Sequence, residues 1–277
     1  MKQTKARQLF KKKFGQQNHF LITSLIGLDY IENGDDIKCP DSFSTSWNPR
    51  DKKQSARRSR DFLLQSFLSF AVDGIDLYLS ELNTAPKYIL DVGFTEALCA
   101  AERSVYKKVK NISEYLTSDK LLKSLCLVLI TYRNNLLHSK AENVVEEVDK
   151  DLLLENRMYI SENFCRLDIE VLLTKVEKKE PPTFKEVASL IRATQKFVEE
   201  IDSQIISRIS PDFIYETIKY YFTRNPKTFD KYLCFTEDQR KKQIKNILEN
   251  SLAIPPSEYT FSKAMLDIKK EDVRVKK

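Results

Sequence analysis

The apolar residues of this chain recur every three or four positions over long stretches, and this spacing constrains the fold more than any other feature of the sequence. Between residues 53 and 82 the apolar stripe consists of Leu64, Phe67, Leu68, Ala71, Ile75, Tyr78, Leu79 and Leu82. Polar residues occupy the opposite positions, as in a helix with one buried face. Only 5 glycines interrupt the 277 residues, and no long segment alternates strictly as a half-buried strand does. The sequence therefore predicts an all-α protein.

Capping residues and prolines set the expected helix boundaries. Thr183 with Glu186, and Thr236 with Gln239, have the spacing of capping boxes at helix starts. Ser118 and Asp119 are good N-cap residues for a helix that enters the polar run beginning at residue 132. We expect helices over residues 16–32, 53–82, 95–116, 119–137, 183–208, 210–225 and 236–252, with one or two shorter helices between 145 and 176.

These segments suggest three parts. Residues 1–50 are read as a basic N-terminal extension, in which Trp47 anchors a loop, residues 51–209 as a bundle of antiparallel helices, and residues 210–277 as a helical appendage. Residues 1–60 hold 13 Lys or Arg against 6 Asp or Glu, a net charge of +7 compared with +6 for the whole chain. A basic arm of this kind is able to hold a polyanion, but a solubilising, partly disordered tail explains the charge equally well.

The composition points to a cytoplasmic protein without a metal centre. No uninterrupted apolar run approaches the length of a membrane span, and the basic start lacks the apolar core of a signal peptide. The five cysteines are widely spread and form no C-x-x-C pair, which is typical of reduced thiols. Cys126 falls on an apolar helix face and is expected in the core. We therefore expect no cofactor and no membrane partner.

The most unusual polar residues follow the most apolar segment. Residues 121–130 are almost entirely apolar, and the run Tyr-Arg-Asn-Asn-Leu-Leu-His-Ser from 132 to 139 follows them directly. On a helix, Asn134 and His138 share a face, whereas Arg133 lies about 140° around the axis from His138. The long Arg133 side chain is able to turn toward the imidazole if the helix end is packed. Charged and polar groups in such a place are either paired or used on a ligand.

These side chains suit the cleavage of RNA. The 2′-hydroxyl is a built-in nucleophile that needs a general base, and the leaving oxygen needs a general acid. Histidine is suited to these proton transfers, and an arginine fork stabilises a pentacoordinate phosphate without a metal. Only two histidines occur in the chain, and His19 lies in a distant segment where a structural role is expected. A two-fold dimer would supply a second His138, unless water or Arg133 acts as the acid.

The segment from Arg133 to His138 resembles the R-x4-H motif of the HEPN superfamily, with Asn134 as the favoured polar residue after the arginine. The family often carries an acidic residue on an earlier bundle helix, for which Asp76 is the first candidate and Asp73 the second. The resemblance covers about residues 55–208. It implies a metal-independent endoribonuclease that leaves 2′,3′-cyclic phosphate ends and has its active site at a homodimer interface. Such proteins commonly serve toxin–antitoxin or antiviral defence systems.

Further residues are candidates for contacts with a substrate. Arg57 and Arg58 are able to grip RNA phosphates, and Ser139 follows the motif histidine directly. The expected substrate is a tRNA loop or an mRNA, and a toxic nuclease further implies an antitoxin or a triggering partner protein. A cluster of Tyr220, Tyr221, Phe222 and Arg224 is able to stack bases, although the helical spacing of its aromatic residues favours core packing.

Other interpretations of the motif stay open. Arg133 and His138 are also suited to capping a helix C-terminus, where cations bond free carbonyls and favour the helix dipole. A HEPN-like module that binds RNA, nucleotide or a partner protein without cleaving it would carry the same residues. A regulatory helical subunit with a capped helix is a third possibility. Arg57 and Arg58 are then solvated residues at a helix start, and Asp73 and Asp76 solvated acids.

Overall fold

The computed structural model describes residues 3–34, 38–39, 42, 49–85, 87–89, 91–138, 143–209, 211–252 and 266–273. These residues form thirteen helices and no strand, which confirms the all-α prediction. The helices are α1 (Lys5–Asn33), α2 (Lys52–Leu82), α3 (Val92–Cys99), α4 (Val105–Leu116), α5 (Lys120–Leu137), α6 (Glu147–Glu155), α7 (Arg157–Asn163), α8 (Ile169–Lys178), α9 (Phe184–Ser207), α10 (Pro211–Arg224), α11 (Pro226–Leu233), α12 (Glu237–Leu252) and α14 (Lys270–Val273). The loop residue Trp47 and the candidate Ser139 lie outside the described residues.

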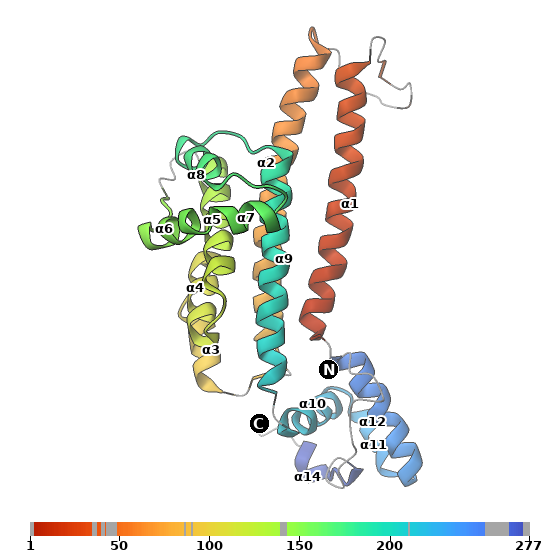
Figure 1. Ribbon diagram of the computed structural model, residues 1–277. Coiled ribbons are helices and arrows are strands. Elements are labelled where there is room, and N and C mark those ends of the chain that lie inside the picture. The colour runs from red at the N-terminus through yellow and green to blue at the C-terminus, as the bar shows by residue number, and fades with distance from the viewer. Residues whose placement is uncertain are drawn as a thin grey trace.

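Helices α1 and α2 form a long antiparallel hairpin (Figure 1). The Thr4 side chain caps α1 by accepting a hydrogen bond from the Arg7 backbone N–H, and Asp51 caps α2 through the N–H of Gln54. The helix expected over residues 16–32 is thus longer and begins at Lys5. Part of the segment read as an extension therefore packs against the bundle.

A glycine allows α1 and α2 to pack closely in the half of the hairpin that lies against the bundle. A Cβ atom at Gly74 of α2 would lie only 3.1 Å from the Phe14 ring and 3.2 Å from the Phe10 ring of α1. The two phenylalanine rings stack with centroids 4.7 Å apart, and both are buried. The missing side chain at Gly74 therefore lets α1 approach α2 closely enough to bury its aromatic face.

The bundle core lies between α2, α4, α5 and α9 (Figure 1). Every residue of α5 from Ser124 to Tyr132 is buried, including Cys126, as expected. Helix α9 begins at the predicted capping box, in which Thr183 and Glu186 bond each other's backbone N–H groups. The shorter helices α6 and α8 pack against α5, and α7 contacts both of them.

Two further helix boundaries differ from the sequence prediction. The single helix expected over 95–116 is broken into α3 and α4, because Glu102 has a left-handed backbone (φ 51°) and Ser104 caps a new helix through the Lys107 N–H. Asn225-Pro226 ends α10 as expected, but Pro226 also begins α11. Proline is tolerated at a first helical position, where its missing N–H has no partner to lose.

The C-terminal helices α10, α11, α12 and α14 form a cluster of their own beside the end of the bundle (Figure 1). Phe222 is buried at its centre, with ring centroids 4.9 Å from Phe229 and 4.7 Å from Tyr232. The Tyr88 ring, which follows α2, stacks on Phe213 of α10 at 5.2 Å. This stack joins the cluster to the bundle.

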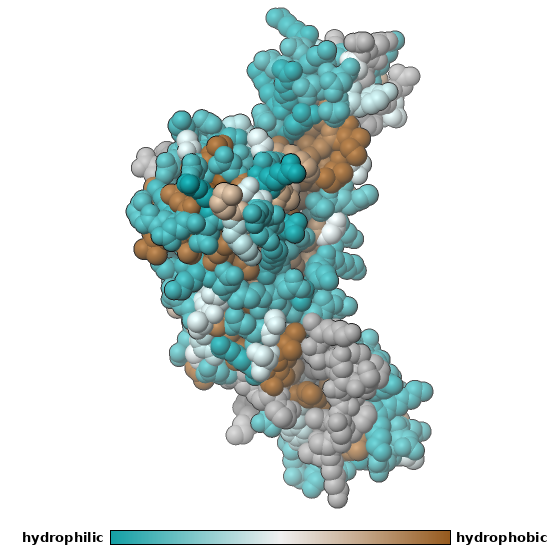
Figure 2. Space-filling model, viewed as in Figure 1, coloured by the Kyte–Doolittle hydropathy of each residue, from teal (hydrophilic) through white to brown (hydrophobic). Residues whose placement is uncertain are grey.

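The outer half of the hairpin exposes many apolar side chains, and Figure 2 shows an apolar area beside the polar tip. Large exposed residues here are Phe20, Ile22, Ile26 and Tyr30 of α1 and Phe62 of α2. Within the described chain, α2 is the one helix long and apolar enough to cross a membrane, by length and composition alone. Half of the most apolar stretch of α2 is buried inside the structure. The core helix of a soluble protein also has this length and composition, so they are weak evidence for a membrane span.

A buried carboxylate on α9 holds the start of α1 in place. Asp202 is completely buried and accepts hydrogen bonds from the Thr4 backbone N–H (3.0 Å), the Thr4 hydroxyl and the Tyr78 hydroxyl (3.2 Å). Burial raises the pKa of the Asp202 carboxyl, and the hydrogen bonds from Thr4 oppose that shift. Three helices, α1, α2 and α9, thus meet at one side chain.

Replacing Asp202 tests this junction. Asp202→Ala leaves the buried Thr4 N–H and Tyr78 hydroxyl without an acceptor, so we expect it to lower the free energy of unfolding by about 1–3 kcal/mol. Glu199→Ala is the matched control, because Glu199 is an exposed partner of Arg7 on the same helix, and its loss should cost less than about 1 kcal/mol. Urea unfolding followed by circular dichroism measures both. Equal stability of the two variants would contradict the role of Asp202.

Candidate functional site

Helix α5 carries the Arg-Asn-His run to the surface of the bundle. Its N-cap Asp119 accepts hydrogen bonds from the N–H groups of Leu121 (2.8 Å) and Leu122 (3.1 Å), so the predicted cap is confirmed. The helix ends at His138, which has an extended backbone and donates its backbone N–H to the Asn134 carbonyl at 3.0 Å. Arg133 and Asn134 therefore belong to the last helical turns, and His138 is the C-cap residue.

Arg133 is half-buried beside two carboxylates of α2. Its Nε atom is buried and has no hydrogen-bond partner in the described part of the chain. Burial lowers the pKa of the Arg133 guanidinium, while the charges of Asp73 and Asp76 act in the opposite direction. The structure thus brings together three of the residues singled out from the sequence, one from α5 and two from α2.

Asp76 also has a partner that the sequence did not indicate. The Lys108 ammonium of α4 lies 2.6 Å from an Asp76 carboxylate oxygen. Asp73 is exposed, and it forms no ion pair or hydrogen bond with another described residue. The site therefore has two cations and two anions on α2, α4 and α5. Lys108 is one of several lysines in a strongly amphipathic helix, and only the packing of α4 against α2 selects it.

The side chains of Asn134 and His138 are available to a ligand. His138 is exposed and Asn134 is half-buried. Within the described ranges, none of the side chains of Arg133, Asn134 and His138 bonds a carbonyl of α5. The backbone N–H of His138 closes the last turn by donating to the Asn134 carbonyl. The arrangement thus differs from a C-terminal cap made by cationic side chains.

Asn135 holds the end of α5, and sequence reasoning had assigned it no role. This residue is buried and donates its amide N–H₂ to the carbonyls of Asn143 (2.8 Å) and Val176 (3.3 Å), while its oxygen accepts the Asn143 backbone N–H (3.0 Å). An amide inside an apolar segment is a signal for such bridging, because buried amides are nearly always hydrogen-bonded. Asn135 fixes the direction in which Arg133 and His138 leave the helix.

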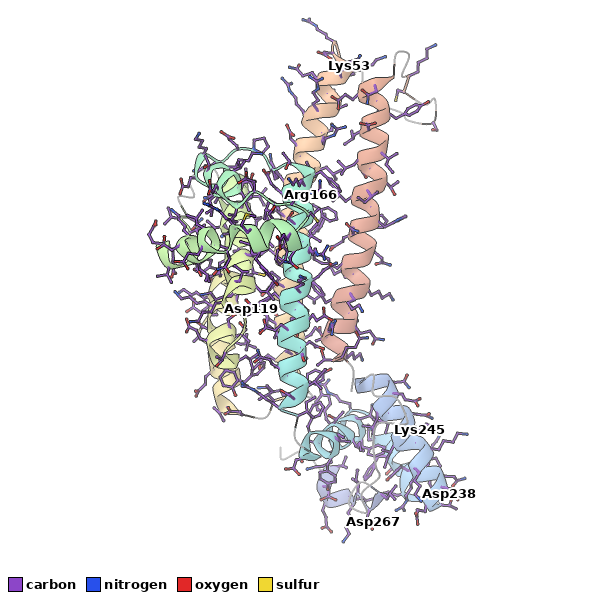
Figure 3. The ribbon with its side chains drawn as sticks, in the orientation of Figure 1. Lys53, Asp119, Arg166, Asp238, Lys245 and Asp267 are labelled. Atoms are coloured by element: carbon purple, nitrogen blue, oxygen red, sulfur yellow. The ribbon has the colours of Figure 1, made fainter. Side chains whose placement is uncertain are left out.

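The remaining candidates lie elsewhere. Arg57 precedes Asp76 by 19 residues on α2, about 28 Å along the helix axis. Its Nε donates to Glu32 of α1 at 2.7 Å, whereas Arg58 is exposed and borders a surface groove near Phe62. Figure 3 labels Lys53 at the same outer end of the hairpin, beyond the bundle that contains Asp119. The structure does not bring these arginines to Arg133.

The surface around Arg133 is open and partly apolar. None of the described cavities is lined by Arg133 or His138. Phe70 is 42% exposed and lies three residues before Asp73, and Leu137 is 48% exposed and lies four residues after Arg133. Residues at these spacings share a helix face. The charged cluster is therefore flanked by exposed apolar side chains on both helices.

Other titratable groups are separate from this cluster. His19 is exposed on α1, 6.4 Å from the Phe20 ring, and burial strongly raises the pKa of the Cys126 thiol. The described residues contain no group of three or more His, Cys, Asp or Glu side chains arranged to hold a metal ion.

Substitutions of Asn135 and His138 distinguish a residue that stabilises the end of α5 from one that is available to a ligand. Asn135→Ala removes three hydrogen bonds made by a buried amide, so we expect it to lower the free energy of unfolding by about 1–3 kcal/mol. His138→Ala removes an exposed ring without a partner in the described structure and should change stability by less than about 0.5 kcal/mol. Thermal and urea unfolding compare them. A large loss of stability in His138→Ala would instead indicate a capping role for the ring.

Comparison with known proteins adds no further constraint on the site. The chain matches no family model, and no curated protein or solved structure is detectably similar to it. The chemistry of Arg133, His138 and the α2 carboxylates is therefore the basis for a functional inference.

Proposed function

We propose that this protein is a metal-independent endoribonuclease with a HEPN-like bundle. The carrying observation is the Arg133 guanidinium, whose Nε is buried without a partner in the described chain, next to an open surface and five residues before a free histidine. A buried donor without an acceptor is costly, so such a group is expected to have a ligand. A phosphate offers two oxygens that an arginine guanidinium is able to bind at the same time.

The proposed reaction is a transesterification within RNA. His138 removes the proton from the 2′-hydroxyl, whose oxygen attacks the adjacent phosphorus. Arg133 stabilises the negative charge of the pentacoordinate phosphate. The bond to the 5′-oxygen breaks as that oxygen is protonated, and a 2′,3′-cyclic phosphate remains. Asp73 and Asp76 limit the motion of Arg133, and Asn134 contacts the sugar or phosphate.

The reaction requires both an acid and a base, and each chain offers one histidine at this site. A two-fold dimer that joins the two α5 ends would place two His138 side chains in one cleft. Phe70 and Leu137 support this arrangement, because exposed apolar side chains beside the charged cluster are suited to an interface core. The closed active site would then exist only in the dimer, consistent with the open surface of one copy.

We further propose a role as a toxin or antiviral effector that acts on tRNA or mRNA in the cytoplasm, restrained or triggered by a partner protein. The second candidate is a module that binds RNA or nucleotide without cutting it. One copy carries a single histidine at this site and so lacks a separate acid and base, which favours this alternative. Cleavage separates the two candidates directly.

Cleavage of an RNA pool in excess EDTA tests the reaction. We expect the wild-type protein to leave 2′,3′-cyclic phosphate ends, and His138→Ala and Arg133→Ala each to lower the rate at least about 100-fold, since both proton transfer and charge stabilisation are of this order. Lys242→Ala, at an exposed position of α12, is the control and should match the wild type. Salt-sensitive binding without any cleavage would select the non-catalytic module instead.

The dimer has a separate test. Leu137→Glu places a charge on the proposed apolar contact and should convert a dimer into a monomer, with loss of cleavage and unchanged helicity. Val171→Glu on α8, where the valine is similarly exposed at 46%, should leave both mass and cleavage unaltered. Light scattering coupled to size exclusion measures the mass. A monomeric wild-type protein that cleaves RNA would contradict the shared site.

A further inference from the structure

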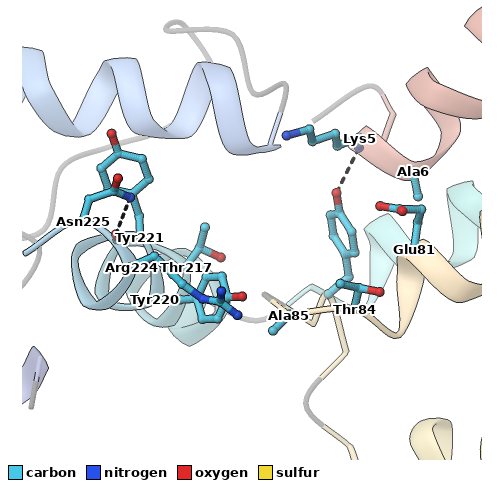
Figure 4. Close-up of a pocket in the computed structure, with 11 residues that line it drawn as sticks. Lys5, Ala6, Glu81, Thr84, Ala85, Thr217, Tyr220, Tyr221, Arg224 and Asn225 are labelled. Carbon is cyan, nitrogen blue, oxygen red and sulfur yellow. Dashed lines mark hydrogen bonds between the residues drawn. The ribbon is translucent and has the colours of Figure 1, made fainter. Parts of the chain in front are cut away.

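A cavity lies between the bundle and the C-terminal cluster. It encloses about 300 Å³ and is formed by the start of α1, the end of α2, the segment that follows α2, and the last turns of α10 (Figure 4). Its lining includes Lys5, Glu81, Tyr88, Tyr220, Tyr221 and Arg224. Clefts between two packed units are a common place for small ligands. None of the residues of the Arg133 site contributes to it.

Two cations reach this cavity from different walls. The Lys5 backbone N–H donates to the Tyr88 hydroxyl at 2.9 Å, and this bond fixes the first turn of α1. The Lys5 side chain extends toward the C-terminal cluster (Figure 4). The Arg224 guanidinium belongs to α10 and lies 5.4 Å from the centroid of the Tyr220 ring. Neither Lys5 nor Arg224 forms an ion pair with another described residue. The cavity is thus equipped to hold an anion.

The same wall offers an aromatic surface and free polar atoms. Arg224 over Tyr220 provides flat surfaces on which a planar ring is able to stack. The hydroxyls of Tyr220 and Tyr221 and the carboxylate of Glu81 have no hydrogen-bond partner among the described side chains. Phe222, by contrast, is fully buried. The expected core role thus holds for Phe222, whereas its two tyrosine neighbours are only partly buried and line the cavity.

We propose that this cavity binds a nucleoside phosphate. The base stacks on Tyr220 and Arg224, and Lys5 pairs with the phosphate. A free nucleotide and an exposed nucleotide of an RNA chain both offer these groups. Since Lys5 belongs to the bundle and Arg224 to the C-terminal cluster, the bound ligand bridges the two units. The inference is independent of cleavage at Arg133.

Calorimetric titration of the full chain tests the site with four probes: adenosine 5′-monophosphate, adenosine, inorganic phosphate and a 2′-O-methyl pentaadenylate. The blocked 2′-hydroxyl prevents cleavage, so the result does not depend on the proposed nuclease activity. We expect one or both nucleotide probes to bind more tightly than adenosine or phosphate. Lys5→Gln and Arg224→Gln should each weaken that binding at least about tenfold, since the first removes a charge-assisted contact and the second removes a stacking surface.

The matched control is Lys227→Gln, which removes an exposed cation of α11 outside the cavity and should leave the affinity unchanged. Preference for the monophosphate identifies a free nucleotide as the source, and preference for the pentaadenylate identifies RNA; either supports the site. Binding of phosphate as tight as that of the nucleotides would overturn the nucleoside assignment. No binding of any probe, or equal binding by the Lys5→Gln/Arg224→Gln double variant, would overturn the site itself.

Discussion

The carboxylate of Asp202 is the interaction on which the arrangement of the first two helices and α9 depends. It is completely buried, yet it accepts hydrogen bonds from two groups of Thr4 and from Tyr78. A carboxylate in the core is tolerated only when its oxygens are satisfied. Because Thr4 also caps α1, one side chain sets both the start of that helix and its position against α2 and α9. The Phe10 and Phe14 rings can then close over Gly74.

This arrangement leaves one side of α2 uncovered, and the charged cluster lies there. Asp73 and Asp76 are on α2, Lys108 on α4 and Arg133 on α5, so three elements of the bundle contribute to a single polar surface. Asn135 supports the same surface from within, because it ties the end of α5 to Asn143 and to the Val176 carbonyl of α8. Asn135 is buried and paired, whereas Asn134 and His138 at the edge of the site have no such partners among the described residues. This division is typical of a binding surface built on a rigid scaffold.

Sequence reasoning predicted the helices whose signals are local. Asp119 and the Thr183–Glu186 box are found as caps, since a cap depends only on residues within one turn. The start of α1 was not predicted, because only four of the 29 residues of this helix are buried and its apolar stripe is therefore weak. The break between α3 and α4 depends on Glu102, whose left-handed backbone no residue preference indicates. Lys108 and Asn135 could not be assigned to the site because their partners lie on other elements, 32 residues away for Lys108.

The junction at Asp202 also has a consequence for how the chain is made. Thr4 and Asp202 are separated by 198 residues, so at 5–20 residues per second the ribosome needs about 10–40 seconds to deliver the second after the first. During that interval the α1–α2 hairpin lacks α9, which packs against both of its helices in the finished fold. Residues of α2 such as Tyr78, whose hydroxyl bonds Asp202 in the finished fold, are then open to chaperones and to neighbouring nascent chains. The order of synthesis therefore makes α9 the segment that completes the bundle.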